Sequence, residues 1–224
     1  MLATRDPRAS QVRSALAALC EAYWRPVYSF IRHSGYLHED ARDLTQAFFA
    51  RMLEKGSFRD ATPERGRFRA FLLGSVRHFL ANERDREHAV KRGGAQVLVS
   101  LDDSDEERQY ALHLAAGATP DEIYASRWAW AVLDQTTRRL RATHTQRGRE
   151  TQFDRLRPFL IGDEPDSYAR LAREVGVSEG ALRVAVHRLR RQFAECLRGI
   201  IAETVERPEE IDDELRFLVA AAGR

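Results

Sequence analysis

Apolar residues recur every three or four positions along most of the chain, which is the spacing of one face of an α-helix. The pattern predicts helices or helix pairs over residues 10–33, 38–55, 68–92, 121–140 and 165–193. No stretch shows the sustained alternation, bounded by hairpin turns, that half-buried strands have. The predicted fold class is therefore all-α.

Glycines and acidic residues interrupt the helical pattern in the middle of the chain. Gly93 and Gly94 end the long helix predicted over 68–92, and five of the six residues from Asp102 to Glu107 are acidic. That composition suits an exposed tether. We therefore predict two small helical domains joined by a flexible acidic linker: 1–95, the linker 96–122, and 123–205.

The helix predicted over 38–55 has two unlike faces. Its apolar stripe consists of Ala41, Leu44, Phe48 and Met52. Its polar side carries Asp40, Asp43, Gln46 and Arg51. We expect the first face to pack into the core and the second to remain free.

Residues 165–193 predict two helices joined by a tight turn. Gly176 supplies the left-handed residue that ends the first helix, and Ser178 caps the second. The apolar residues of the second helix face inward: Leu182, Val186, Leu189 and Phe193. Its basic side then projects outward: Arg183, His187, Arg190 and Arg191. These are the parts of a helix-turn-helix, whose second helix fits the DNA major groove. Plain packing with a solvated basic face is the alternative.

The helix predicted over 68–92 carries a basic strip opposite its apolar stripe. The strip contains Arg69, Arg77, Arg84, His88 and Lys91. A basic strip beside a glycine-containing loop can hold a separated DNA strand, with phosphates on the cations and bases in small pockets. For the aromatic residues Phe68, Phe71 and Phe79, filling of the core is the alternative role.

Composition narrows the class of protein. Hydrophobic residues make up 43% and charged residues 31% of the 224 residues, a globular balance. Because 36 Lys+Arg oppose 34 Asp+Glu, any nucleic-acid surface must come from local segregation of charge. The apolar run 217–222 is far shorter than the roughly 20 residues of a spanning helix, and residues 1–10 lack the apolar stretch of a secretion signal. We expect a cytoplasmic protein with no membrane contact.

Patterns typical of enzymes are missing from the sequence. It contains no Gly-x-Ser-x-Gly, no phosphate-cradling Gly-rich Lys loop and no His-Glu-x-x-His. Cys20 and Cys196 lie too far apart in sequence to indicate a Cys-x-x-Cys metal site. We expect no catalytic residues, no metal and no cofactor.

The order of these parts resembles a known family. DARDLTQAFFARMLE, residues 40–54, is similar to the core-binding helix of sigma-70-type transcription initiation factors. GRFRAFLLGSVRHFLANERDRE, residues 66–87, is similar to their promoter-melting helix, and the helix-turn-helix matches the region that reads the upstream promoter element. With only two domains, the chain resembles the extracytoplasmic-function group of RNA polymerase sigma factors over about residues 10–95 and 123–200.

The resemblance implies partners and site residues. The residues that match the stretch binding the clamp helices of the polymerase β′ subunit are Asp40, Asp43, Gln46 and Phe49. Those matching the −10 element site, beside the base-capturing loop 56–67, are Arg67, Arg69, Arg77, Asn82, Arg84 and Arg86. Those matching the reader of the −35 element are Ser178, Arg183, His187, Arg190 and Arg191. The implied partners are core RNA polymerase, through its β′ clamp helices and β flap, promoter DNA, and an anti-sigma factor or other regulator.

Two parts of the chain depart from that pattern. Residues 138–157 are longer and more basic than in the shortest members, which leaves the helix boundaries there open. The extension 206–224 is amphipathic through Ile211, Leu215 and Leu218, and we expect it to fold back on the C-terminal domain. Docking on a regulator or masking the DNA-reading face are its alternative roles.

Two other functions remain open at the level of sequence. An ordinary helix-turn-helix regulator would bind a palindromic operator tightly without polymerase. A helical polymerase-binding inhibitor would bind core enzyme without directing transcription. For a sigma factor we expect weak binding of the free protein to duplex DNA, because the polymerase holds the assembly together.

Overall fold

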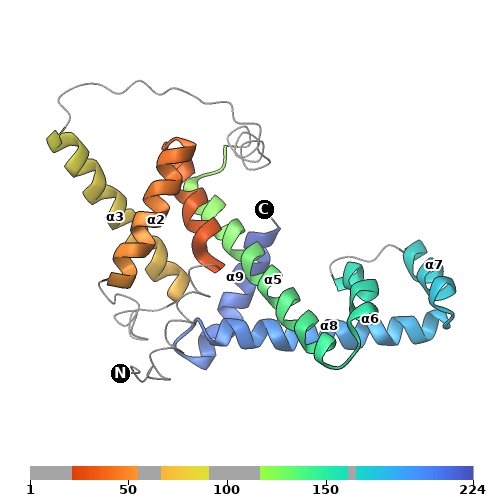
Figure 1. Ribbon diagram of the computed structural model, residues 1–224. Coiled ribbons are helices and arrows are strands. Elements are labelled where there is room, and N and C mark those ends of the chain that lie inside the picture. Colours follow the sequence, from red (N-terminus) through yellow and green to blue (C-terminus); the bar gives the residue numbers. More distant parts are fainter. Residues whose placement is uncertain (1–21, 55–66, 91–116, 161–164, 224) are drawn as a thin grey trace, which may run out of the picture. The chain divides into compact units, whose positions relative to one another are not determined.

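The computed structural model describes residues 22–54, 67–90, 117–160 and 165–223 (Figure 1). Every regular element within these ranges is helical, so the predicted all-α fold class is confirmed. A helical segment over residues 22–33 comes first. The labelled elements follow in chain order: α2 (His38–Glu54), α3 (Phe68–Val90), α5 (Pro120–Gln146), α6 (Glu150–Leu156), η2 (Arg157–Leu160), α7 (Pro165–Val175), α8 (Glu179–Ala202), η3 (Pro208–Glu210) and α9 (Ile211–Ala222).

Local sequence explains both ends of α5. The Glu122 amide donates to Thr119 Oγ1 at 3.3 Å, and the Thr119 amide donates to Glu122 Oε2 at 3.0 Å, which makes a reciprocal N-terminal cap. Pro120 at the first helical position loses no hydrogen bond there. The last residues of the predicted acidic linker therefore belong to this helix, while its stretch 96–116 lies outside the described residues. At the other end Gly148, with φ of +67°, turns the chain into α6.

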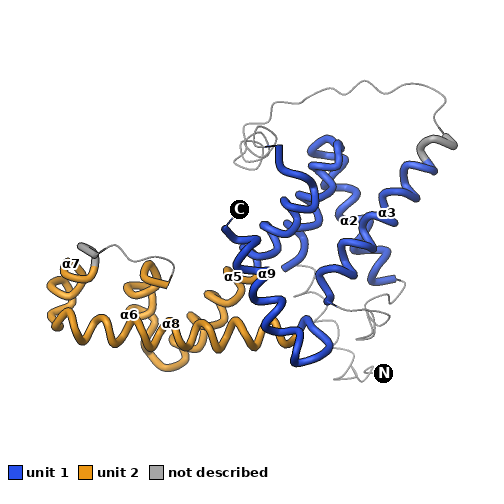
Figure 2. Tube along the Cα trace, turned by 180° about the vertical axis from the view of Figure 1, so that it is seen from behind, with its two compact units in different colours: residues 1–131, 204–224 blue, residues 132–203 orange. Residues whose placement is uncertain are grey.

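The described chain forms two compact units (Figure 2). Unit 1 comprises residues 22–54, 67–90, 117–131 and 204–223, and unit 2 comprises residues 132–160 and 165–203. This division differs from the predicted one. The sequence pattern placed 123–131 in the C-terminal domain and the extension 206–224 against it, whereas both segments belong to unit 1.

The first turns of α5 belong to unit 1 because their large side chains complete its core. Trp128 and Tyr124 are fully buried. The Trp128 indole Nε1 donates to the Tyr23 hydroxyl at 3.1 Å, and Tyr124 meets Phe30 edge to face with 6.3 Å between ring centroids. Burial raises the pKa of Tyr23, which keeps its hydroxyl neutral. The buried indole donor thus has a partner inside the apolar core.

The C-terminal extension forms α9, which packs on unit 1. Ile211 and Leu218 are buried as the amphipathic pattern predicts, and Leu215 is half-buried. Phe217 contacts Trp128, with 5.9 Å between ring centroids. The extension thus packs on the start of α5, which the sequence pattern had assigned to the C-terminal domain, and the structure places both segments in unit 1. Periodicity identifies the apolar face of a helix but does not identify the surface that covers it.

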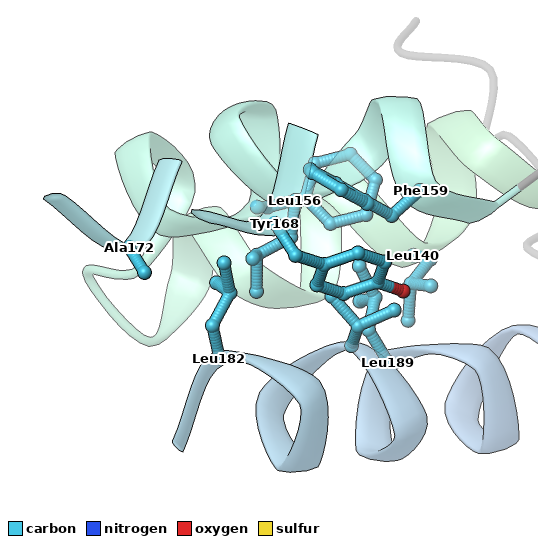
Figure 3. Packing of buried hydrophobic residues seen from close by; sticks show 9 residues of the cluster. Leu140, Leu156, Phe159, Tyr168, Ala172, Leu182 and Leu189 are labelled. Carbon is cyan, nitrogen blue, oxygen red and sulfur yellow. The ribbon is translucent and has the colours of Figure 1, made fainter. Parts of the chain in front are cut away.

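Unit 2 has its own core, built where α6, α7 and α8 meet η2 and the end of α5. Figure 3 shows Leu182 and Leu189 projecting from α8 toward Tyr168 and Phe159. The buried cluster consists of Leu140, Phe153, Leu156, Phe159, Tyr168, Ala172, Leu182, Val186 and Leu189. The predicted inward residues Leu182, Val186 and Leu189 all lie in this cluster, and Phe193 packs against it half-buried. This core fixes which side of α8 remains outside.

Substitution of Ser178 by alanine is expected to lower the free energy of unfolding of unit 2 by about 1 kcal/mol. Ser178 has an extended backbone, and its hydroxyl accepts a hydrogen bond from the Ala181 amide at 3.2 Å, which satisfies one donor at the start of α8. Amide hydrogen exchange in α8 measures the loss. Ser178→Asn keeps a capping oxygen and serves as the control; equal losses in the two variants would contradict the cap.

Candidate nucleic-acid interface

The outer side of α2 is polar and exposed. Asp40, Asp43 and Gln46 all lie in solvent there. Phe49 does not join them: it is buried and stacks on Trp24 with 5.8 Å between ring centroids. The resemblance had grouped Phe49 with the polymerase-facing residues, but its side chain belongs to the core of unit 1. It supports the exposed side of the helix rather than forming part of it.

An exposed leucine extends this side of α2. Leu53 follows Gln46 by seven residues, two turns along the same side of the helix, and is 47% exposed. From the sequence, Leu53 was assigned to neither side of the helix. The spacing of seven residues from Gln46 would have placed Leu53 on this side of the helix. We call the exposed set Asp40, Asp43, Gln46 and Leu53 the α2 face.

The start of the α3 basic strip is held by α9. Arg69 donates from Nε to Glu214 Oε1 at 2.8 Å and from Nη2 to Glu214 Oε2 at 3.0 Å, and its guanidinium lies 3.6 Å from the centroid of the Phe217 ring. Arg67 pairs with Asp213 and with Glu214, each at 3.3 Å. The Glu214 side chain is 1% exposed. These two predicted DNA contacts are therefore part of the packing of unit 1 in this structure.

The later part of α3 remains exposed. Arg77 pairs with Asp121, and Arg86 pairs with Glu83 at 2.8 Å, yet both arginine side chains are more than half exposed. Asn82 also lies in solvent. The predicted strip is thus divided, with its N-terminal end covered and its middle accessible. Lys91 lies outside the described residues.

Arg84 is exposed but positioned by the turn that follows the helical segment 22–33. It donates from Nε to the Tyr36 hydroxyl at 3.1 Å and from Nη2 to the Ser34 carbonyl at 3.2 Å. Its guanidinium also lies 5.4 Å from the centroid of the Tyr36 ring. These contacts already restrict the rotamers of the Arg84 side chain. Binding of a ligand to Arg84 would therefore cost less conformational entropy.

The turn between α7 and α8 has the backbone geometry that the sequence predicts. Gly176 has φ of +72°, and the Val177 amide donates to the Ala172 carbonyl at 3.0 Å, as in a Schellman ending. Ser178 then starts α8 as its cap. α7 and α8 are therefore joined by a three-residue turn.

Two of the predicted −35 contacts are held by unit 2 itself. Arg190 is half-buried, and its Nε donates to the Phe159 carbonyl at 2.9 Å. Arg183 pairs with Glu179 at 2.7 Å, and its guanidinium lies 4.6 Å from the centroid of the Tyr168 ring. Both arginines lie beside the core-facing stripe of α8, so their side chains reach neighbouring parts of the unit.

The residues opposite the core of α8 are exposed. Gly180, Val184, His187, Arg188 and Arg191 follow the spacing of one helix side, and we call them the α8 face. His187 and Arg191 were predicted to lie there, whereas Val184 and Arg188 were missed. Positions four and seven residues beyond Val184 are Arg188 and Arg191. A helical-wheel projection from Leu182, Val186 and Leu189 would have placed all of them on this side.

Other reactive groups form no site among the described residues. No three side chains of the His, Cys, Asp and Glu types gather there in a metal-binding cluster. Burial raises the pKa of the Cys196 thiol, which favours its neutral form and a packing role. Cys20 lies outside the described ranges. Within those ranges, no helix has the length and apolarity needed to cross a membrane.

Comparison of the chain with protein-family models, with curated proteins and with solved structures found no match. Its function has to be inferred from the residues described above.

Proposed function

We propose that the protein is a sigma factor that binds core RNA polymerase and directs it to promoters with −35 and −10 elements. The observation that carries this proposal is the presence, in one chain, of an exposed acidic and polar α2 face and a separate compact unit with a basic α8 face. The first face is unsuited to binding DNA, because its carboxylates repel phosphate. The two faces call for two different partners.

The α2 face suits a protein partner. Asp40 and Asp43 offer carboxylates to arginine or lysine side chains, and Leu53 adds exposed apolar area at the end of the same side. Mixed polar and apolar surfaces of this kind are typical of protein interfaces. In the proposed function the partner is the clamp-helix region of the β′ subunit, and the β flap would contact unit 2.

The accessible part of α3 suits a separated DNA strand. Asn82 can hydrogen-bond a base edge, while Arg77, Arg84 and Arg86 can neutralise phosphates. Melting requires no covalent chemistry, because base pairing and stacking are exchanged for contacts with protein and for phosphate neutralisation. The α8 face would meanwhile bind duplex DNA in the major groove. Such a protein would act in the cytoplasm, where the polymerase works.

The test of this proposal is transcription with purified core enzyme. The full chain is mixed with core polymerase, the complex is isolated, and run-off transcripts are mapped on genomic fragments. The proposal expects a stable complex and discrete start sites that depend on the chain. Tight operator binding without polymerase would indicate a regulator instead, and core binding that yields no start sites would indicate an inhibitor.

Asp43→Lys is expected to weaken binding to core polymerase at least about tenfold. The change places a like charge where the proposed partner is basic, and Asp43 is exposed, so the fold should be unaffected. Competition with a labelled wild-type chain for core enzyme measures the affinity. Glu209→Lys makes the same charge change at an exposed site on η3 and is the matched control. Equal effects in both variants would contradict the role of the α2 face.

A further inference from the structure

The α8 face contains one side chain that does not match its neighbours. Val184 is 51% exposed and is the only large apolar side chain exposed on α8, all of which is described. Around it lie His187, Arg188 and Arg191, which are three, four and seven residues further along. An exposed apolar side chain thus lies directly beside a group of basic residues, on their N-terminal side.

Neither the helix nor the core of unit 2 requires a valine at this position. Valine is a poorer helix former than alanine, because its branched side chain loses rotamer freedom against the preceding turn. The core contacts of this part of α8 come from Leu182 and Val186, which are buried in the core of unit 2. The side chain therefore offers its methyl groups to something outside the unit.

The surroundings of Val184 allow a flat surface to come close. Gly180, one turn before it, carries no side chain, and a Cβ there would meet only open space. Packing within the protein therefore does not account for the absence of a side chain at Gly180. The first two turns of a recognition helix are the part that approaches base edges, and the following turns reach the backbone. Arg188 and Arg191 occupy those following turns.

We propose that Val184 contacts the C5-methyl group of a thymine in the major groove of the upstream promoter element, while Arg188 and Arg191 neutralise adjacent phosphates. The inference rests on the proposed function and deepens it, because it names the base that this part of α8 recognises. The thymine methyl is the one apolar group that the major groove presents, and small apolar side chains read it by excluding water. Hydrogen-bond donors and acceptors on the base are not needed for this contact.

The contact has a chemical test, because deoxyuridine differs from thymidine only by lacking that methyl group. Once the start sites are mapped, each thymidine of the upstream element is replaced singly by deoxyuridine. Promoter affinity is then measured for holoenzyme made with the wild-type chain and with Val184→Ala. At one position the wild type is expected to lose about fourfold in affinity, which corresponds to one buried methyl group. Val184→Ala is expected to bind both forms of that promoter equally.

Val219→Ala is the matched control, because it removes the same atoms from an exposed valine on α9. It should keep the full preference for thymidine. If Val184→Ala retains that preference at every position, or if the wild type has none, the inference is overturned while the sigma-factor function stands. If no holoenzyme forms, the proposed function fails and the inference fails with it. The two failures are therefore distinguishable.

Discussion

Glu214→Ala is expected to lower the free energy of unfolding of unit 1 by about 3–5 kcal/mol. The Glu214 carboxylate is almost completely buried and accepts two hydrogen bonds from Arg69. Arg69 is itself enclosed, with its guanidinium 5.1 Å from the centroid of the Trp128 ring and 3.6 Å from that of Phe217. Removal of the carboxylate leaves an unpaired guanidinium under two aromatic rings.

Tryptophan fluorescence during urea denaturation measures this loss. The three tryptophans of the chain, Trp24, Trp128 and Trp130, all lie in unit 1, so the signal reports that unit selectively. Asp213→Ala is the control, because Asp213 is half exposed and its pair with Arg67 is a surface ion pair. Its expected cost is below about 1 kcal/mol. If the two variants lose equal stability, α9 does not hold Arg69 as described.

The ion pair between Arg69 and Glu214 also divides the predicted −10 residues into two groups. Arg67 and Arg69 are paired with α9, whereas Asn82 and Arg86 are exposed. In the proposed function, contacts with the melted strand then come from the second half of α3. The packing of α9 sets the edge of the surface that is open to DNA.

Helical periodicity was sufficient to predict the elements that carry these surfaces. The helices predicted over 38–55 and 68–92 match α2 and α3 within two residues at each end. The turn at Gly176 and the cap at Ser178 were predicted from residue type alone, since a left-handed residue and a capping hydroxyl have few substitutes. Local interactions determine these features, and local sequence is enough to find them.

Contacts between distant segments were not predictable in this way. Nothing near Glu214 in sequence indicates that its partner is Arg69, 145 residues away. The burial of Phe49 and the half-buried position of Arg190 could not be predicted for a related reason. Both lie beside the core-facing stripe of their helices, where a side chain can turn inward or outward, and the neighbouring elements decide which. Periodicity alone therefore does not show whether a side chain at such an edge is buried or exposed.

The double substitution Arg188→Ala and Arg191→Ala is expected to lower the promoter affinity of the holoenzyme on the order of tenfold to a hundredfold. Both guanidinium groups are exposed on the α8 face, and the pair of Arg191 with Glu195 at 3.5 Å is a weak surface contact. Loss of two phosphate contacts should also reduce the magnitude of the slope of log K against log salt concentration by about two. Stability of unit 2 should change little.

Arg190→Ala is the informative comparison. It removes a guanidinium group from the same helix, but it is expected to lower the stability of unit 2 and to leave DNA binding unchanged. Its guanidinium donates to the Phe159 carbonyl, so the variant should lose about 1–2 kcal/mol of stability in unit 2. The salt slope of promoter binding should keep its wild-type value, since Arg190 faces its own unit. Titrations of promoter binding at several salt concentrations, with hydrogen exchange in α8, separate the two effects. A wild-type slope for the double variant and a reduced slope for Arg190→Ala would assign DNA binding to the opposite side of α8.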